Sequence, residues 1–327
     1  MSWIEETLHK FIDKKVLIVG DVMIDRYLTG HVSRISPEAP VPIVNLDNIE
    51  NRLGGAANVA LNINALKATP IIASIVGNDE NGKLFKKVLS GNNIDESFIL
   101  ESKYRITTVK SRIISSNQQM LRIDSEITTD LNDEDEGNFV QLLAGIIKEQ
   151  DPHVILLQDY NKGVLTANVI EWITKQANLL SIPVAVDPKN KNFFKYKNVT
   201  LFKPNLKEVK EALAMDIHPV KDELIDASAK IREHIHNDIT LITLSENGVF
   251  IDDNISSNIY PTHPRNVSDV CGAGDTVISI VSLGLASGIS TKELAILANY
   301  SGGQVCEKPG VVPVDKEQLL TELANFE

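Results

Sequence analysis

The sequence predicts an α/β protein in which helices cover both faces of a mostly parallel sheet. Short apolar runs alternate along the chain with helical stretches, and this alternation is typical of parallel sheets. The 327 residues, of which 43% are hydrophobic and 23% charged, can bury a core of the size that such a fold needs. The length fits one large α/β domain or two modest ones, and no internal repeat or linker divides the chain.

Six apolar runs are the predicted strands of this sheet, and the residues that follow them are candidate site residues. Ligands of open α/β sheets bind at the carboxyl ends of the strands. The predicted strands are Val16–Gly20, Ile71–Gly77, Val154–Asp159, Val184–Asp187, Thr200–Pro204 and Leu241–Leu244. The residues at or after their ends are Asp21, Asp79, Asp159, Asp187, Asn205 and Ser245. We therefore expect these polar side chains at one edge of the sheet.

Two segments interrupt the alternation of strands and helices. Residues Pro40–Leu46 and Thr107–Ile123 carry strand-forming residues with no intervening helical period. They predict a small antiparallel sheet that stands off the main domain. Such a sheet could be a mobile lid over the site or an ordinary edge hairpin, and the pattern alone favours neither.

The segment from Asp269 to Thr276 reads Asp-Val-Cys-Gly-Ala-Gly-Asp-Thr and precedes a long apolar helix. Small residues at 272–274 allow backbone amides to approach a ligand, and the helix adds the positive end of its dipole. Asp275 then places a candidate general base beside an anion site, the pairing that a sugar kinase needs. The alternative is tight helix packing without a ligand. A dinucleotide fingerprint is excluded, because Val277 stands where a third small residue is required.

Two further motifs are compatible with ligand binding and also with a purely structural role. Gly54-Gly55-Ala56-Ala57-Asn58 opens a helix, where the glycines could admit a ligand and Asn58 could bond sugar hydroxyls, or where the turn could simply be tight. Asn205 and Glu208 share a first helical turn, where oxygen atoms suit Mg²⁺, although a capping box is favoured on the residues alone. Residues Gly77–Leu84 resemble a Walker A spacing, but a leucine replaces the metal-binding hydroxyl, so a P-loop is rejected.

Composition restricts the class of protein. Lys and Arg number 32 and Asp and Glu 44, and the resulting charge of −12 argues against a nucleic-acid or anionic-membrane partner. The two cysteines, Cys271 and Cys306, suit a reducing cytosol. The N-terminal residues lack the apolar core of a signal peptide, and the uncharged stretch Thr276–Thr291 is shorter than the roughly 20 residues of a membrane span. The sequence therefore predicts a cytoplasmic protein in which this stretch is a buried helix.

Three ordered motifs resemble those of the ribokinase-type, or PfkB, carbohydrate kinases, over nearly the whole chain. Gly54–Asn58 resembles the N-terminal signature of the family, Asn205–Glu208 its Asn-x-x-Glu motif, and Asp269–Asp275 its C-terminal signature. The resemblance implies a three-layer α/β fold in a single kinase domain over residues 1–327, with a β-sheet lid formed by about residues 31–52 and 104–124. It further implies homodimers that form through this lid, ATP and Mg²⁺ as cofactors, and K⁺ as a further candidate.

Four other segments resemble the branch of this family that phosphorylates D-glycero-D-manno-heptose 7-phosphate at C1. They are Val19–Tyr27, Ser33–Pro42, Asn117–Asp124 and Asp159–Gly163. The resemblance implies heptose 1,7-bisphosphate as the product, for lipopolysaccharide or surface glycans. In many bacteria this kinase is fused to a C-terminal adenylyltransferase, and this chain resembles a stand-alone kinase or a kinase half. The alternatives are a family kinase of ribose, fructose or a nucleoside, and a silent regulator that binds a sugar phosphate.

The resemblance also assigns roles at the reacting centre. Asp275 would accept the proton of the C1 hydroxyl, and the amides of the small residues before it would stabilise the transferred phosphoryl group. The residues expected to act in catalysis are Asp275, Gly272, Ala273 and Gly274. Asn205 and Glu208 would order Mg²⁺ through water, and Asp269 would lie beside a monovalent cation.

The substrates are expected to contact residues from several motifs. The residues expected at the sugar phosphate are Asp21, Asp25, Arg34, Gly54, Gly55, Asn58, Arg112, Arg122 and Lys189. The basic members of this set are included because a phosphate on the substrate needs cationic partners. The residues expected at ATP are Asn205, Glu208, Thr243, Ser245, Gly248 and Asn299.

Three departures from the family pattern concern the nucleotide. Cys271 replaces the hydroxyl residue that commonly precedes the Gly-Ala-Gly-Asp motif, a harmless change if that position contributes only its main-chain carbonyl. Leu244 stands where the heptose branch often has arginine, and Cys306–Gly310 differs from the usual glycine-lysine form. None of these departures touches Asp275.

Overall fold

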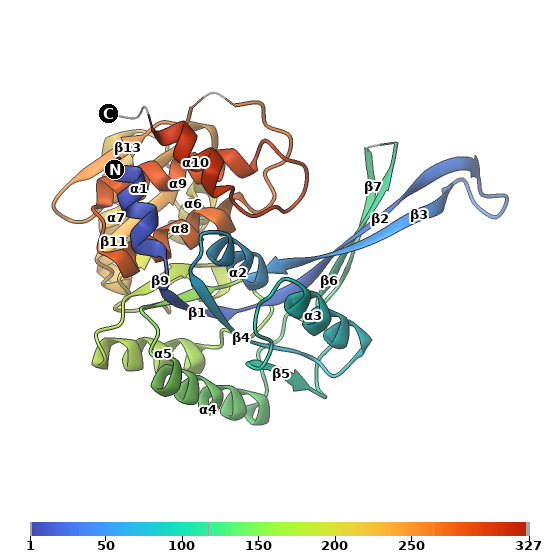
Figure 1. Ribbon diagram of the computed structural model, residues 1–327, viewed down its shortest axis with the longest axis horizontal. Coiled ribbons are helices and arrows are strands. Elements are labelled where there is room, and N and C mark those ends of the chain that lie inside the picture. Colours follow the sequence, from blue (N-terminus) through green and yellow to red (C-terminus); the bar gives the residue numbers. More distant parts are fainter. Residues whose placement is uncertain (1, 117, 264, 325–327) are drawn as a thin grey trace.

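A nine-stranded sheet forms the middle layer of the protein in the computed structural model, which describes residues 2–116, 118–263 and 265–324 (Figure 1). Its strand order is β13-β12-β11-β10-β9-β8-β1-β4-β5, and neighbours are parallel except at β12, which is antiparallel to β11 and β13. The strands are β1 (Lys15–Gly20), β4 (Thr69–Gly77), β5 (Ile99–Ser102), β8 (Val154–Gln158), β9 (Val184–Asp187), β10 (Leu201–Phe202), β11 (Ile239–Thr243), β12 (Val249–Asp252) and β13 (Ser257–Tyr260). The predicted mostly parallel sheet is confirmed. Of the short unpredicted strands, β5 and β13 form the two edges and β12 lies beside β13.

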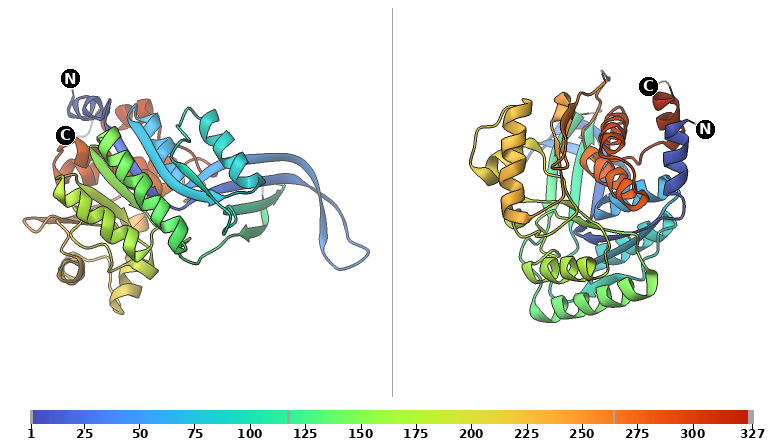
Figure 2. Two further views of the ribbon diagram at one scale, coloured as in Figure 1. Left: turned by 90° about the horizontal axis from the view of Figure 1, so that it is seen from below. Right: turned by 90° about the vertical axis from the view of Figure 1, so that its left-hand side faces the viewer.

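Different helices cover the two faces of this sheet, as Figure 2 shows. Side chains alternate along each strand, so Val16 and Ile18 of β1 enter one core while Leu17 and Val19 enter the other. Over the first core lie α1 (Trp3–Phe11), α2 (Ala56–Ala65), α3 (Glu80–Gly91), α8 (Ala273–Ser287), α9 (Thr291–Val305) and α10 (Lys316–Leu323). Over the second lie α4 (Asp133–Gln150), α5 (Ala167–Leu179), α6 (Leu206–Leu213) and α7 (Lys221–Ile235). Two 3₁₀ turns, η1 (Asn190–Asn192) and η2 (Ser245–Asn247), follow β9 and β11.

A second sheet projects from the body as a long ribbon (Figure 1). Its strands are β2 (Val22–Ile35), β3 (Pro42–Gly55), β6 (Val109–Ser115) and β7 (Gln118–Ser125), in the order β3-β2-β6-β7. The sequence predicts an antiparallel sheet, but β2 and β6 are parallel to each other. They are parallel because the chain returns to β6 through a crossover that contains α2, β4, α3 and β5. The lid extends closer to the body than the expected residues 31–52, since β2 starts at Val22 and β3 ends at Gly55. Asn117 of the expected lid lies outside the described residues.

The two faces of this lid sheet differ in chemistry. Residues paired across strands point to the same side, and one row of neighbours reads Arg52, Asp25, Lys110 and Asp124 while the next reads Glu50, Tyr27, Arg112 and Arg122. The opposite side carries an apolar row across all four strands, formed by Ile49, Leu28, Ile113 and Leu121. The charged face lies toward the body, because a Cβ placed on Gly310 would lie 2.6 Å from Arg52 Nη1.

Helix α8 is the buried helix that the sequence predicts. It begins at Ala273 after Gly272, whose φ of +84° is a left-handed conformation that glycine adopts without strain. The helix packs between α2 and α9 and against β8 and β9, so its first turn stands over the carboxyl end of the sheet. Among the described helices, none combines the length and the apolar character that crossing a membrane requires.

Candidate active site

Asp275 lies on the first turn of α8 and is 5% exposed. Its Oδ1 accepts hydrogen bonds from Tyr160 Oη at 2.5 Å and from Gln158 Nε2 at 3.1 Å, and its Oδ2 accepts one from Asn58 Nδ2 at 2.8 Å. Three separate segments therefore hold this carboxylate: the start of α2, the end of β8 and the loop after β8. The structure brings Asn58 and Asp275 together, as the predicted sugar site requires.

The surroundings of Asp275 suit a base that acts near neutral pH. Burial raises the pKa of Asp275 to about 6, against the opposing hydrogen bonds from Asn58 and Tyr160. The carboxyl is therefore mostly ionised at pH 7. Among the described residues, the buried Oδ1 of Asn58 has no hydrogen-bond partner. A buried acceptor of this kind, on the amide that holds Asp275, fits a ligand hydroxyl.

The start of α8 has no side-chain cap and lies beside a buried cation. No side chain caps this helix, and the first amides of a helix have no partner within it. A Cβ placed on Gly274 would lie 3.8 Å from Lys203 Nζ, and Lys203 pairs with Asp187 at 3.1 Å. Lys203 is 3% exposed, so its charge is poorly screened by solvent. Amides and an ammonium group in this arrangement fit a phosphate, which is how ATP would be held at Gly272–Gly274.

Asp21 is a buried carboxylate that contacts the loop after β8. The residue is 1% exposed, and its carboxylate accepts hydrogen bonds from the backbone amides of Tyr160 at 2.8 Å, Lys162 at 2.9 Å and Val164 at 3.0 Å. Burial raises the pKa of Asp21, and these three amides oppose the rise. Asp21 thus holds the loop after β8, and its contact with a sugar stays a prediction.

Asp159 is a second buried carboxylate under the same loop. It accepts hydrogen bonds from Tyr196 Oη at 2.6 Å and from the amide of Asn161 at 2.7 Å. Burial and the nearby charge of Asp21 raise the pKa of Asp159 to about 6. The two carboxylates anchor the turn that presents Tyr160 to Asp275.

The predicted sugar residues at the root of the lid are closely packed. Asp25 is 4% exposed and forms an ion pair with Arg112 across β2 and β6. A Cβ placed on Gly54 would lie 2.2 Å from Asp25 Oδ2, and one on Gly55, whose φ is +61°, would lie 2.4 Å from the carbonyl oxygen of Asp21. Close packing therefore requires both glycines, and their contact with a sugar stays a prediction.

The four basic residues predicted at the substrate phosphate lie in different places. Arg112 and Arg122 are register neighbours on the charged face of the lid, where Arg122 bonds Asp124 at 2.9 Å. Lys189 lies over the ring of Tyr160 at 5.9 Å and pairs with Glu208. Arg34 is exposed near the outer end of β2 and pairs in register with Ile43 of β3. Of the four, Arg112 and Arg122 are direct neighbours, and each is paired with a carboxylate.

Asn205 and Glu208 form the capping box of α6. Asn205 Oδ1 accepts the amide of Glu208 at 2.8 Å, and Glu208 Oε2 accepts the amide of Asn205 at 2.9 Å. The other oxygen of Glu208 pairs with Lys189, so direct ligation of Mg²⁺ by this carboxylate does not fit and contact through water does. Within residues 2–116, 118–263 and 265–324, no three His, Cys, Asp or Glu side chains gather in an arrangement that could hold a metal ion.

The other residues predicted at ATP lie near the capping box and at the edge of α9. Thr243 is bridged to Asn205 as a parallel β-partner, and Ser245 and Gly248 form the turn that follows β11. Asn299 Nδ2 donates to the carbonyl oxygens of Tyr260 and Pro261, at 2.8 and 2.7 Å. Asn299 thus fixes the chain after β13, and direct contact with ATP remains a prediction.

Asp269 connects two loops at the mouth of the site. Its Oδ1 accepts the amide of Cys271 at 3.0 Å, and its Oδ2 accepts the amide of Gly310 at 3.0 Å. Burial raises the pKa of Asp269, but hydrogen bonds such as these lower it further, so that the pKa lies below its ordinary value. The pKa of the Cys271 thiol is raised to about 11 by burial and by Asp269, so this thiol is protonated at neutral pH. A monovalent cation near Asp269 stays a prediction.

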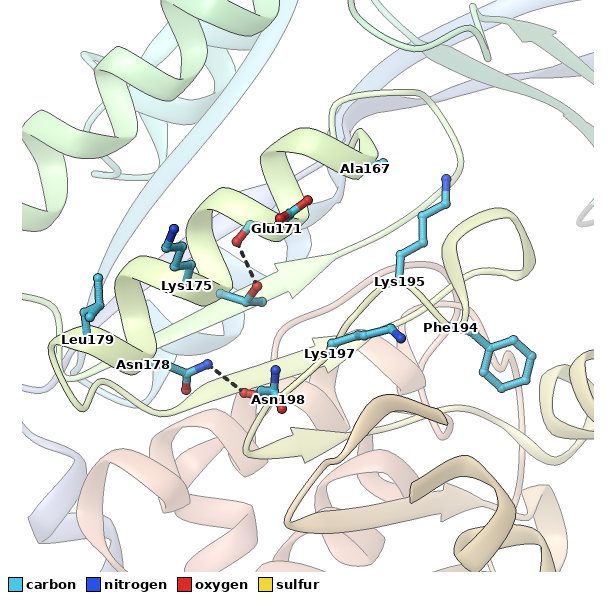
Figure 3. A pocket seen from close by; sticks show the side chains of 10 residues that line it. Ala167, Glu171, Lys175, Asn178, Leu179, Phe194, Lys195, Lys197 and Asn198 are labelled. Atoms are coloured by element: carbon cyan, nitrogen blue, oxygen red, sulfur yellow. Dashed lines mark hydrogen bonds between the residues drawn. The ribbon is translucent and has the colours of Figure 1, made fainter. Parts of the chain in front are cut away.

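A groove of about 740 Å³ lies elsewhere, between α5 and residues 194–198 (Figure 3). Three lysines, Lys175, Lys195 and Lys197, line it together with Glu171 and the hydrogen-bonded pair Asn178 and Asn198, which are 3.1 Å apart. None of the residues predicted at the site belongs to this groove. The groove is therefore separate from the predicted site.

The sequence reasoning missed three residues of the Asp275 network. Tyr160 lies within a segment that carries the family resemblance, and Gln158 and Lys203 lie within predicted strands. A polar side chain inside an apolar strand run was the available signal for the last two, because a buried polar group requires a partner. The segment with Walker A-like spacing, Gly77–Leu84, contains the start of α3. Asp79 caps this helix by accepting a hydrogen bond from the amide of Gly82, at 2.7 Å.

The fold is shared with solved sugar-kinase structures. The phosphofructokinase-2 of Escherichia coli in complex with potassium superposes with a TM-score of 0.80 at 17% identity, over 96% of this chain and 100% of that one. The ribokinase of Arabidopsis thaliana complexed with ribose and ATP superposes with a TM-score of 0.72 at 18% identity, over 97% and 100%. These structures show that the protein has a ribokinase-like fold.

The family model for the pfkB family carbohydrate kinases matches residues 13–317, and the chain belongs to this family. Among curated relatives, the "Bifunctional protein HldE" of Helicobacter hepaticus is 40% identical over 306 residues, which are 94% of this chain and 63% of that protein. The protein of the same name from Campylobacter curvus is 40% identical over 316 residues, 96% of this chain and 66% of that protein. The chain thus spans less than two thirds of the length of these relatives.

Proposed function

We propose that this kinase transfers the γ-phosphoryl group of ATP to the C1 hydroxyl of D-glycero-D-manno-heptose 7-phosphate. The product, heptose 1,7-bisphosphate, would enter the synthesis of ADP-heptose for lipopolysaccharide or surface glycans. The observation that carries the proposal is the buried Asp275 beside the uncapped start of α8 and Lys203, beneath a lid with a charged inner face. The four segments that resemble the heptose branch support this choice of sugar.

The geometry supports a direct displacement. Asp275 takes the proton of the C1 hydroxyl while that oxygen forms a bond to the γ-phosphorus and the bond to the leaving ADP oxygen breaks. The amides of Gly272–Gly274 and the ammonium of Lys203 stabilise the charge that develops on the transferred group. When bound, ATP supplies the phosphoryl group and Mg²⁺ neutralises its oxygens, with Asn205 and Glu208 positioned to order the waters of the ion.

The lid offers a place for the phosphate that the substrate already carries. Arg112 and Arg122 are adjacent across β6 and β7, and Lys110 lies on the same face in the next row. A phosphate can displace the carboxylates that now neutralise these groups, since it offers more negative charge and bidentate geometry for arginine. Two charge-assisted hydrogen bonds would favour a phosphorylated sugar over its free form by roughly a hundredfold in kcat/KM.

The test is ADP release across a panel of acceptors: heptose 7-phosphate, free heptose, fructose 6-phosphate, ribose and adenosine. We expect heptose 7-phosphate to be preferred. A preference for ribose, fructose 6-phosphate or adenosine would instead identify another sugar kinase of the family. An Asp275→Asn variant should lose about 10²- to 10⁴-fold in turnover while it still binds the sugar phosphate by calorimetry. Asp13→Asn, at an exposed turn, is the matched control.

Binding without turnover in the native protein would favour a silent regulator. Undiminished turnover of Asp275→Asn, with the control also active, would remove Asp275 as the base.

We further propose that the kinase forms a homodimer through the lid. The apolar row on the outer face of the lid is incompletely covered, with Ile49 51% and Leu121 55% exposed, and Ile123 of the adjacent row is 51% exposed. An apolar band on a projecting sheet is typical of an interface between copies. Leu121→Asp should give monomers in light scattering, whereas Leu179→Asp, at an exposed leucine of α5, should not. A native protein that is monomeric at micromolar concentration would contradict this proposal.

A further inference from the structure

Tyr160 makes a short contact with Asp275 that no motif assigned, at 2.5 Å between Tyr160 Oη and Oδ1. The phenol can only be the donor in this bond while Asp275 is ionised. Burial and the adjacent charge of Asp275 raise the pKa of Tyr160 well above its usual value of 10, so the phenol keeps its proton. The bond therefore persists throughout the pH range in which Asp275 acts as a base.

The loop that carries Tyr160 is anchored on both sides of the residue. The amides of Tyr160, Lys162 and Val164 donate to Asp21, and the amide of Asp159 donates to the carbonyl of Asp187 at 3.1 Å. A loop with this many fixed backbone groups does not swing away when a substrate arrives. The phenol is therefore a permanent part of the surroundings of Asp275, rather than a group that a sugar hydroxyl replaces.

The two oxygens of Asp275 are not equivalent in this arrangement. A carboxylate has about four acceptor positions, two on each oxygen. Oδ1 uses two of them, for Tyr160 and Gln158, whereas Oδ2 uses one, for Asn58. A further acceptor position therefore remains on Oδ2 of Asp275. This oxygen accepts the hydrogen bond of Asn58, whose own side-chain oxygen has no partner among the described residues.

We propose that Tyr160 is a positioning residue, which fixes the rotamer of Asp275 and directs the proton of the acceptor hydroxyl to Oδ2. This inference rests on the proposed role of Asp275 as the base. Tyr160 also makes the base weaker, because its hydrogen bond stabilises the ionised carboxyl. The charged groups that face Asp275 from other elements are Asp187 at the end of β9, Lys203 after β10 and Lys189 beyond Asp187. None of these groups is altered when the phenol oxygen is removed.

The experiment compares the pH dependence of kcat and kcat/KM in the native kinase, Tyr160→Phe and the matched control Tyr104→Phe, whose hydroxyl bonds Glu134 at the surface at 2.7 Å. Tyr160→Phe should lower kcat roughly tenfold to a hundredfold with a small change in KM. Its acid limb should move to higher pH by about one unit, because Asp275 loses a hydrogen bond to its charged form. The control should match the native enzyme.

Site-specific 3-fluorotyrosine at position 160 tests the same bond without altering the packing. Its more acidic phenol is a stronger donor, so the acid limb should move to lower pH, opposite to the change in Tyr160→Phe. Unmoved acid limbs in both variants would overturn the inference, as would a raised KM with unchanged kcat, which would make Tyr160 a substrate contact. These outcomes are distinct from failure of the proposed base, which active Asp275→Asn would reveal.

Discussion

Replacing Asp21 by asparagine should destabilise the kinase rather than weaken its hold on the sugar. The Asp21 carboxylate is buried, with Tyr160 and Lys162 amides on Oδ2 and the Val164 amide on Oδ1. An asparagine has only one acceptor oxygen, and this oxygen would satisfy more donors if it faced the amides of Tyr160 and Lys162. Its NH₂ group would then point at the Val164 amide, leaving two donors without an acceptor.

The magnitude follows from these two donors. Each buried donor without a partner costs about 1 to 3 kcal/mol, so the free energy of unfolding should fall by about 2 to 6 kcal/mol. The neutral side chain avoids the burial of a charge, which makes the lower part of this range the expectation near pH 7. The attraction between Asp21 and Arg105 is also lost.

Urea unfolding at pH 7.5 measures this change, with Asp13→Asn as the matched control. Hydrogen exchange adds a local readout, since the amides of Tyr160, Lys162 and Val164 should exchange faster in Asp21→Asn, and turnover should fall in step with the loss of the ordered loop. Unchanged stability and hydrogen exchange, together with a raised KM for the sugar phosphate, would refute this structural role and support Asp21 as a substrate contact.

Three further predictions concern the base, the buried cation and the root of the lid. Turnover should fall about tenfold per pH unit well below pH 6 in steady-state assays, because Asp275, with a pKa of about 6, must be ionised to accept a proton. Lys203→Met should lower the free energy of unfolding by about 3 to 5 kcal/mol in urea, because it leaves Asp187 buried without its cation, and Lys203→Met with Asp187→Leu should recover part of this loss. Gly55→Ala should lower the melting temperature, because φ is +61° and the new Cβ would meet a backbone oxygen at 2.4 Å.

Most of the parallel strands, and the edge of the sheet where polar residues gather, were predictable from the sequence. Runs such as Val154–Asp159 identify parallel strands by composition, and the rule that ligands gather at carboxyl ends places Asp187 and Asn205 without knowledge of their contacts. The lid root was harder to predict. The first residues of β2 mix charged and apolar side chains because one face packs on the body and the other faces the site. No simple period reveals such a strand.

The division of labour among carboxylates was also beyond the sequence. Asp21, Asp159 and Asp275 all follow or face strand ends, yet Asp21 and Asp159 accept backbone amides of one loop whereas, among the described residues, Asp275 accepts side-chain donors only. That distinction depends on which backbone amides approach which oxygen, and this is decided by packing between segments more than a hundred residues apart. The Asn205 and Glu208 pair shows the same limit, since one spacing serves both a cap and a possible metal environment.

The lid grows directly out of the site at both of its inner ends. Strand β2 starts at Val22, one residue after Asp21, and β3 ends at Gly55, which begins the helix that carries Asn58. Fourteen extended residues make an arm of about 45 Å, and the pivot of this arm coincides with the reacting centre. A force applied at the outer end of the lid, for instance by a second subunit, would thus be transmitted to Asn58, whose side-chain amide donates a hydrogen bond to Asp275. In the proposed dimer, the strands that join the subunits would therefore lead directly into the proposed site.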